Sequence, residues 1–246
     1  NQLFFMVLIS SVTSSLLFFV WRLLQGFFML VDARLIYKTL RWICMMYMLP
    51  FGYAAVLITY HGWFCGDIRL WKIVFVRSGE ITFGVRVVAL VWFAIVIALI
   101  LFFMLGELRW NLKRRDNILE DDPVAAEIFQ QVCDSLGISR GKVKLYRNVL
   151  VNTPLVIGWL HPEVLLPEND YTPDDLELIF FHELSHRKQG DLLFKKFVII
   201  VILIHCINPV AVFLLFRTVN LWSECMADLL ALEASGNMHR ASLYYN

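Results

Sequence analysis

The stretch FFHELSHRKQGD (residues 180–191) stands directly before a long apolar run, LLFKKFVIIVILIHCINPVAVFLLF (residues 192–216). It contains an H-E-x-x-H pattern, in which His182 and His186 are four residues apart. On a helix, side chains at this spacing project from one face, one turn apart, so that both imidazoles can bind a single ion. Glu183 is rotated by about 100° from His182, which lets it reach a water molecule beside the ion. The pattern therefore predicts the site of a zinc hydrolase.

The residues around the pattern predict a well-capped helix. Thr172 suits the N-cap, Pro173 the first turn and Gly190 the position just past the end. Two aspartates in the first turn complement the helix dipole. Apolar residues, LELIFF, precede His182. We therefore expect the helix to be buried where the histidines lie.

A third metal ligand is available in NLWSECMADLLAL (residues 220–232). Catalytic zinc sites keep three protein ligands and leave the fourth position to water. Glu224 is the candidate third ligand, and Asp228 would accept a hydrogen bond from the other ring nitrogen of a zinc-bound histidine, most plausibly His182. The alternative is that Glu224 and Asp228 are solvated residues on an amphipathic helix.

The apolar run between His186 and Glu224 decides whether these residues can meet. A single straight span would place its two ends about 30 Å apart, on opposite faces of a membrane. Pro209 lacks an N–H donor and disfavours helix at Asn208, so the run is interrupted near its middle. We predict a helical hairpin or re-entrant pair that dips into the membrane and returns Glu224 to the histidines; a kinked but uninterrupted span is the competing interpretation.

Composition indicates a membrane protein, because 59% of the 246 residues are hydrophobic and only 17% are charged. Three apolar stretches reach the roughly 20 residues that cross a bilayer: 3–30, 42–60 and 87–105. A net charge of +1 gives no support for nucleic-acid binding. The five cysteines show no paired spacing, so we expect free thiols.

Basic residues give a weak topology signal. They follow the first and third apolar stretches, but residues 61–86 are also basic. We expect the N-terminus outside the cell and the region after Leu105 in the cytoplasm. That region changes to a soluble composition, and KVKLYRNVLVNTPLVIGWLHPEVLLP (residues 142–167) predicts two or three short strands.

Four segments resemble the membrane-embedded zinc peptidases of the beta-lactam-sensor type (BlaR/MecR): FFHELSHRKQGDLLFK, INP, ECMAD and NTPLVIGWLHPEVLLPEN. The E-x-x-A-D form is also similar to membrane peptidases that process prenylated proteins or clear damaged membrane proteins. Relatives often carry Cys where this chain has Ala227. The resemblance implies a thermolysin-like (gluzincin) HExxH-plus-Glu arrangement. It also implies an edge strand that pairs with an extended substrate by β-augmentation, formed by Leu155, Val156, Ile157, Gly158 and Trp159.

The expected fold is therefore a mainly α membrane protein with a small α+β zinc-peptidase domain. Its expected parts are three transmembrane helices with short loops (1–105), the cytoplasmic peptidase region (106–191), the apolar hairpin (192–219) and the helix carrying Glu224 (220–246). The expected protein is a multi-pass zinc endopeptidase of the plasma membrane that cleaves a protein substrate at the cytoplasmic side in regulated proteolysis or signal transduction, with Glu183 as its catalytic base. Either a sensor domain lies beyond Asn246 or this relative has none. The alternatives are a quality-control protease and a non-catalytic signal transducer with a vestigial site.

Overall fold

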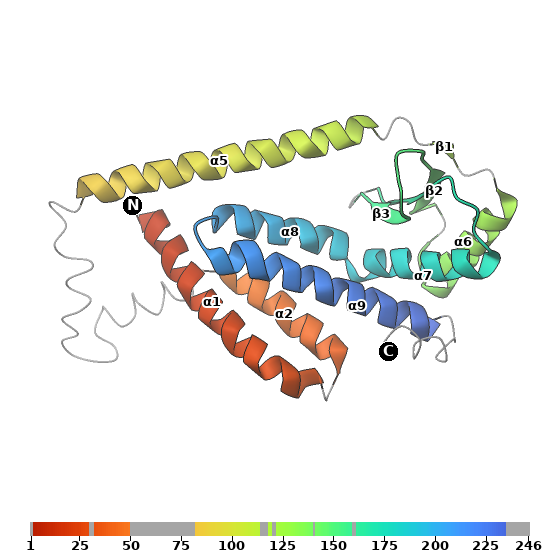
Figure 1. Ribbon diagram of the computed structural model, residues 1–246, viewed down its shortest axis with the longest axis horizontal. Coiled ribbons are helices and arrows are strands. Elements are labelled where there is room, and N and C mark those ends of the chain that lie inside the picture. The colour runs from red at the N-terminus through yellow and green to blue at the C-terminus, as the bar shows by residue number, and fades with distance from the viewer. Residues whose placement is uncertain are drawn as a thin grey trace. The chain divides into compact units, whose positions relative to one another are not determined.

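A computed structural model describes residues 2–29, 32–49, 82–113, 118–119, 122–139, 141–158 and 161–234 (Figure 1). The chain divides into two compact units. Unit 1 is Asn1–Gly106 with Val198–Thr218, and unit 2 is Glu107–Phe197 with Val219–Asn246. The mainly α fold with one small sheet agrees with the expected fold class.

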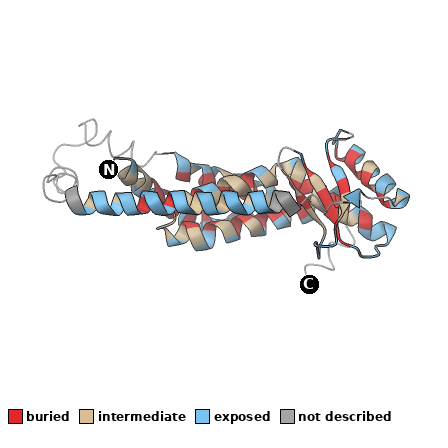
Figure 2. Cartoon of the chain, turned by 90° about the horizontal axis from the view of Figure 1, so that it is seen from above, coloured by how far each residue is buried: buried red, intermediate tan, exposed pale blue. Residues whose placement is uncertain are grey.

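Unit 1 contains the helices α1 (Gln2–Met29) and α2 (Ala33–Met48) and most of α5 (Thr82–Lys113). The α1 and α2 helices pack together, and the Ser10 hydroxyl donates to the backbone oxygen of Tyr47 at 3.0 Å. Figure 2 shows that most of α5 is exposed, and the exposed residues are largely apolar. An apolar helix with no polar face is suited to lipid.

Within the described residues, three helices are long and apolar enough to cross a membrane: Leu3–Gly26, Gly84–Arg109 and Val210–Ala234. The first and second of these overlap the first and third predicted stretches. The predicted stretch at residues 42–60 was wrong at its start, because α2 begins at Ala33, where the Asp32 side chain accepts from the Arg34 N–H. Leu49 is extended, as the following proline requires, and the rest of that stretch lies outside the described residues.

The apolar run forms a helical hairpin. Helix α8 (Asp191–Ile204) is followed by a turn, a π-helix (η2, Val210–Leu215) and α9 (Phe216–Ala234), and α8 and α9 lie side by side in Figure 1. At the turn, the Asn208 N–H donates to the His205 backbone oxygen at 2.8 Å, and the Asn208 side chain accepts from the Val210 N–H at 2.9 Å. The chain reverses here and does not form one kinked span.

Buried polar contacts hold this turn within unit 1. The Asn208 amide donates to the Ser11 hydroxyl at 2.6 Å and to the Ser15 hydroxyl at 2.7 Å. His205 Nε2 lies 3.0 Å from the backbone oxygen of Tyr47. The bend in the apolar run is therefore fixed by α1 and α2 as well as by Pro209.

Unit 2 contains a sheet of four described strands in the order β1-β2-β4-β3. The strands are β1 (Ile118–Leu119), β2 (Lys144–Arg147), β3 (Leu155–Ile157) and β4 (Glu163–Leu166). β2 and β4 run parallel, whereas β1 and β3 pair antiparallel at the two edges. Three of these strands lie in residues 142–167, where the sequence predicted two or three, and β1 lies before that stretch.

The helices α6 (Pro123–Ser135) and α7 (Pro173–Gln189) pack against each other and share a core with the sheet. The rings of Phe129 and Phe180 meet edge to face, with centroids 5.2 Å apart. Val164, Leu166 and Leu184 are completely buried in the same cluster. This core fixes α7, the helix that carries the H-E-x-x-H pattern.

Three predicted boundaries fall inside helices. α5 continues past residue 105 to Lys113, α8 begins at Asp191, and α9 runs through residue 219. The predicted boundaries follow changes in composition, whereas the ends of the helices follow backbone hydrogen bonding, so the two do not coincide.

Candidate metal centre

Helix α7 is capped at both ends. The Thr172 hydroxyl oxygen accepts from the Asp175 N–H at 3.2 Å, and the Asp175 carboxylate accepts from the Thr172 N–H at 3.4 Å. At the other end, Gly190 has a left-handed backbone with φ of 73°. Glycine adopts this conformation without steric cost, so the helix ends sharply after Gln189.

The two histidines of α7 meet Glu224 of α9. Glu224 Oε2 lies 3.4 Å from His182 Nε2 and 3.3 Å from His186 Nε2. One ligand atom from each of the three residues lies within 4.8 Å of the others. Two imidazole nitrogens and one carboxylate oxygen form a donor set that suits zinc. The sequence placed these three residues together, and the structure has them together.

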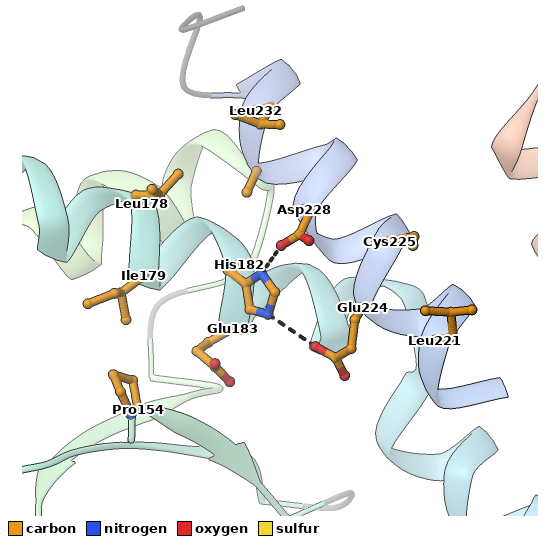
Figure 3. Close-up of a pocket in the computed structure, with 11 residues that line it drawn as sticks. Pro154, Leu178, Ile179, His182, Glu183, Leu221, Glu224, Cys225, Asp228 and Leu232 are labelled. Carbon is orange, nitrogen blue, oxygen red and sulfur yellow. Dashed lines mark ion pairs between the residues drawn. The ribbon is translucent and has the colours of Figure 1, made fainter. Parts of the chain in front are cut away.

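A carboxylate lies at the other ring nitrogen of each histidine. Asp228 Oδ1 is 2.9 Å from His182 Nδ1, an ion pair that Figure 3 marks with a dashed line, and Asp191 Oδ2 is 3.0 Å from His186 Nδ1. A carboxylate that accepts from Nδ1–H orients the ring so that Nε2 faces Glu224 and can bind a cation once Nε2 has lost its proton. Sequence reasoning proposed Asp228 but missed Asp191, whose only signal is its position directly after Gly190.

Glu183 lines the same cavity as His182 and Glu224. Burial raises the pKa of the Glu183 carboxyl group. The two neighbouring imidazoles, and a hydrogen bond donated by the backbone N–H of Val156, oppose this rise. The α7 helix, which carries Glu183, contacts the edge strand β3.

The pKa of each histidine is raised. The hydrogen bond with Glu224 is the main cause of the rise at His182. At His186, burial lowers the pKa, but hydrogen bonds with Asp191 and Glu224 outweigh this effect and raise the pKa to about 9. Protons therefore compete with a cation for the ring nitrogens near neutral pH.

The cavity beside the centre has a volume of about 560 Å³. Its polar lining includes His182, Glu183, Glu224 and Asp228. Its other lining residues are mostly apolar and come from α7, α9 and the segment before β3; Figure 3 labels most of them: Pro154, Leu178, Ile179, Leu221, Cys225, Ala231 and Leu232. Ionisable and apolar groups thus line one cavity, as in most small-molecule and peptide sites.

The predicted substrate strand is partly described. Leu155, Val156 and Ile157 form β3, which lies at an edge of the sheet, and β3 contacts α7. Gly158 follows with φ of 79°. Trp159 lies outside the described residues.

Lys195 is a further neighbour of the centre that the sequence did not reveal. Its Nζ lies 3.0 Å from Glu224 Oε1, the carboxylate oxygen that does not face the two histidines. Within an apolar run, a lysine is usually interpreted as a side chain that reaches the membrane surface. Here, one turn after Asp191, it instead orients the third candidate ligand.

Membrane-crossing helices together with an H-E-x-x-H helix and a third carboxylate define a membrane protein of the metallopeptidase class. Residues 76–242, more than half of the chain, match the family described as BlaR1 peptidase M56, and the chain belongs to this family. Over 75 residues the chain is 29% identical to the regulatory protein BlaR1 of Bacillus licheniformis. This match covers 30% of this chain and 12% of that protein. The resemblance to beta-lactam-sensor-type peptidases is therefore confirmed.

Proposed function

We propose that this chain is a zinc metalloendopeptidase that hydrolyses a peptide bond of a protein substrate at the cytoplasmic face of the plasma membrane. The observation that carries the proposal is the approach of Glu224 Oε2 to both histidine Nε2 atoms, beside a cavity that Glu183 also lines. Membership of a peptidase family supports it.

The side chains fit a catalytic zinc ion. His182, His186 and Glu224 would hold it, and three protein ligands are the number found in catalytic sites rather than structural ones. Zinc, when bound, supplies Lewis acidity that polarises a carbonyl group and lowers the pKa of water to about 7. The carboxylates at both Nδ1 atoms orient the histidines for this role.

Glu183 is the proposed general base. Its carboxylate would take a proton from the attacking water and then pass it to the leaving amine. A general base works best when its pKa lies near the working pH, and burial moves the pKa of Glu183 in that direction.

The substrate is proposed to bind as an extended chain along the edge strand, residues 155–159. The N–H and C=O groups of a strand residue point to the same side. Because β3 pairs only with β4 among the described strands, N–H and C=O groups of β3 that point away from β4 could bond to a substrate strand. Side chains of the bound segment would enter the apolar part of the cavity.

The cytoplasmic orientation and the part in regulated proteolysis rest on the basic residues after the α5 helix and on the regulatory relative. The partners of the chain would be the bilayer, the substrate and a sensor domain beyond Asn246. A quality-control role would share the same chemistry with different substrates.

Cleavage of a pool of internally quenched peptides by the detergent-purified protein tests the proposal. We expect wild-type cleavage to stop with a zinc chelator and to return with added zinc. His182→Ala should abolish cleavage, whereas His161→Ala, which replaces an exposed histidine, should not. Cleavage that resists the chelator and persists in His182→Ala would contradict a zinc mechanism, and no cleavage of any peptide or protein would favour the non-catalytic transducer.

A further inference from the structure

We propose that Asp191 and Ser223 form a buried clamp that fixes His186, and that metal affinity depends more strongly on this clamp than on Asp228 at the other histidine. The inference rests on the proposed function, since it concerns the affinity of the same centre. It assigns positioning roles to two residues on two different helices.

Two donors meet at one carboxylate oxygen. Asp191 Oδ2 lies 3.0 Å from His186 Nδ1, and the Ser223 hydroxyl donates to the same oxygen at 2.8 Å. Taken as whole residues, with backbone atoms included, Asp191 and Ser223 are both 0% exposed, and His186 is 6% exposed. A buried carboxylate is costly unless it is paired, so this oxygen holds its donors firmly.

The clamp joins three helices. His186 is in the last turn of α7, Asp191 is the first residue of α8, and Ser223 is on α9. The left-handed Gly190 turns the chain so that Asp191 returns to a histidine only five residues earlier. Because Ser223 directly precedes Glu224, its bond to Asp191 also sets the position of the third candidate ligand along α9.

The other histidine is held less firmly. Asp228 is 2.9 Å from His182 Nδ1, but the side chains of Asp228 and His182 are 52% and 26% exposed. The corresponding values for Asp191 and His186 are 1% and 8%. Water competes for an exposed hydrogen bond and leaves a buried one intact, so loss of the buried partner costs more.

The expected effects follow from this difference. Removal of an outer carboxylate partner typically weakens metal affinity by about 10- to 100-fold. We expect Asp191→Asn to reach this range, Ser223→Ala to weaken zinc binding by about tenfold, and Asp228→Asn to weaken it by less than Ser223→Ala. Asp174→Asn removes one charge from the exposed first turn of α7 and should change nothing.

The experiment is a zinc titration of the full chain in detergent against a chromophoric chelator, for wild type and the four variants. The visible spectrum of the Co²⁺-loaded protein reports ligand geometry, and circular dichroism checks the fold. Altered spectra for Ser223→Ala and Asp191→Asn, with the stated order of affinities, would support the clamp. If Asp191→Asn fails to fold, Ser223→Ala decides, because it removes only a hydroxyl group.

Two results separate this inference from the proposed function. If wild type binds zinc but Ser223→Ala matches Asp174→Asn within about twofold, or Asp228→Asn shows the larger loss, the clamp is overturned and the zinc centre stands. If wild type binds no zinc, the proposed function and the clamp are both overturned.

Discussion

Replacing Glu183 with glutamine separates metal binding from catalysis. Glutamine has nearly the same volume, and its oxygen can still accept from the Val156 N–H that holds the carboxylate now. The candidate metal ligands are untouched, because Glu183 is not among them. We therefore expect Glu183→Gln to bind as much zinc as wild type.

The loss of activity should be large. General-base catalysis contributes about 10²- to 10⁴-fold, and each factor of ten corresponds to about 1.36 kcal/mol. Among the described residues that line the cavity, the other carboxylates are Glu224 and Asp228. Glu224 contacts both histidines and Lys195, and Asp228 contacts His182, so neither can replace the lost base. We expect the upper half of the range, about 10³- to 10⁴-fold, or about 4–5.5 kcal/mol.

The assay is the initial rate of cleavage of a quenched peptide, measured with zinc content on the same preparation. Glu177→Gln, on the exposed side of α7, is the matched control and should behave as wild type. Retention of more than a tenth of the activity by Glu183→Gln would refute its role as the base. Loss of zinc together with activity would show that the residue acts on the metal instead.

Four further results are expected. Gly190→Ala should destabilise the fold by about 1–2 kcal/mol because alanine is strained at φ of 73°, whereas Gly106→Ala in helix α5 should not; thermal unfolding compares them, and equal melting temperatures would count against the strain. Zinc affinity should rise by about tenfold per pH unit per displaced proton up to pH 9, because the raised pKa of His186 keeps it protonated below that pH; a flat titration from pH 6 to 9 would oppose this. Phe180→Ala should cost about 3–5 kcal/mol in denaturant unfolding, since Phe180 is completely buried, and a loss below 1 kcal/mol would contradict its place in the core. A cysteine placed at Glu177 in a cysteine-free chain should react with an impermeant maleimide only in inside-out vesicles; labelling from outside would reverse the proposed topology.

Local rules predicted the parts of the centre that depend on one helix. The bounds of α7 follow from Thr172, Pro173 and Gly190, and the spacing of the two histidines determines their common face. Glu224 could be anticipated because a catalytic zinc site needs a third ligand and Pro209 interrupts the run before it. These arguments need no knowledge of how distant segments pack.

The missed features depend on packing between distant segments. Asp191 looks like an ordinary residue after a helix stop, and only the left-handed turn at Gly190 directs it back to His186. Lys195 contacts Glu224 only because α8 and α9 lie side by side. The two-residue strand β1 exists through its pairing with Tyr146 and Arg147. No local pattern marks such contacts.

Hydropathy alone also misplaced the second apolar helix. A hydropathy average finds where a chain is apolar, but a helix begins where its first N–H groups find acceptors. Asp32 provides that acceptor, so α2 begins at Ala33, before the apolar stretch. The bounds of α7 were predicted correctly because they were taken from its capping residues and not from hydropathy.

The most direct test of the account is the metal content of the detergent-purified protein, measured by mass spectrometry for wild type, Glu224→Ala and the exposed control Glu177→Ala. We expect one zinc ion per chain in wild type and in the control, and a loss of most of it in Glu224→Ala, because the hairpin returns Glu224 to His182 and His186. Equal zinc in wild type and Glu224→Ala, or no zinc in wild type, would contradict it.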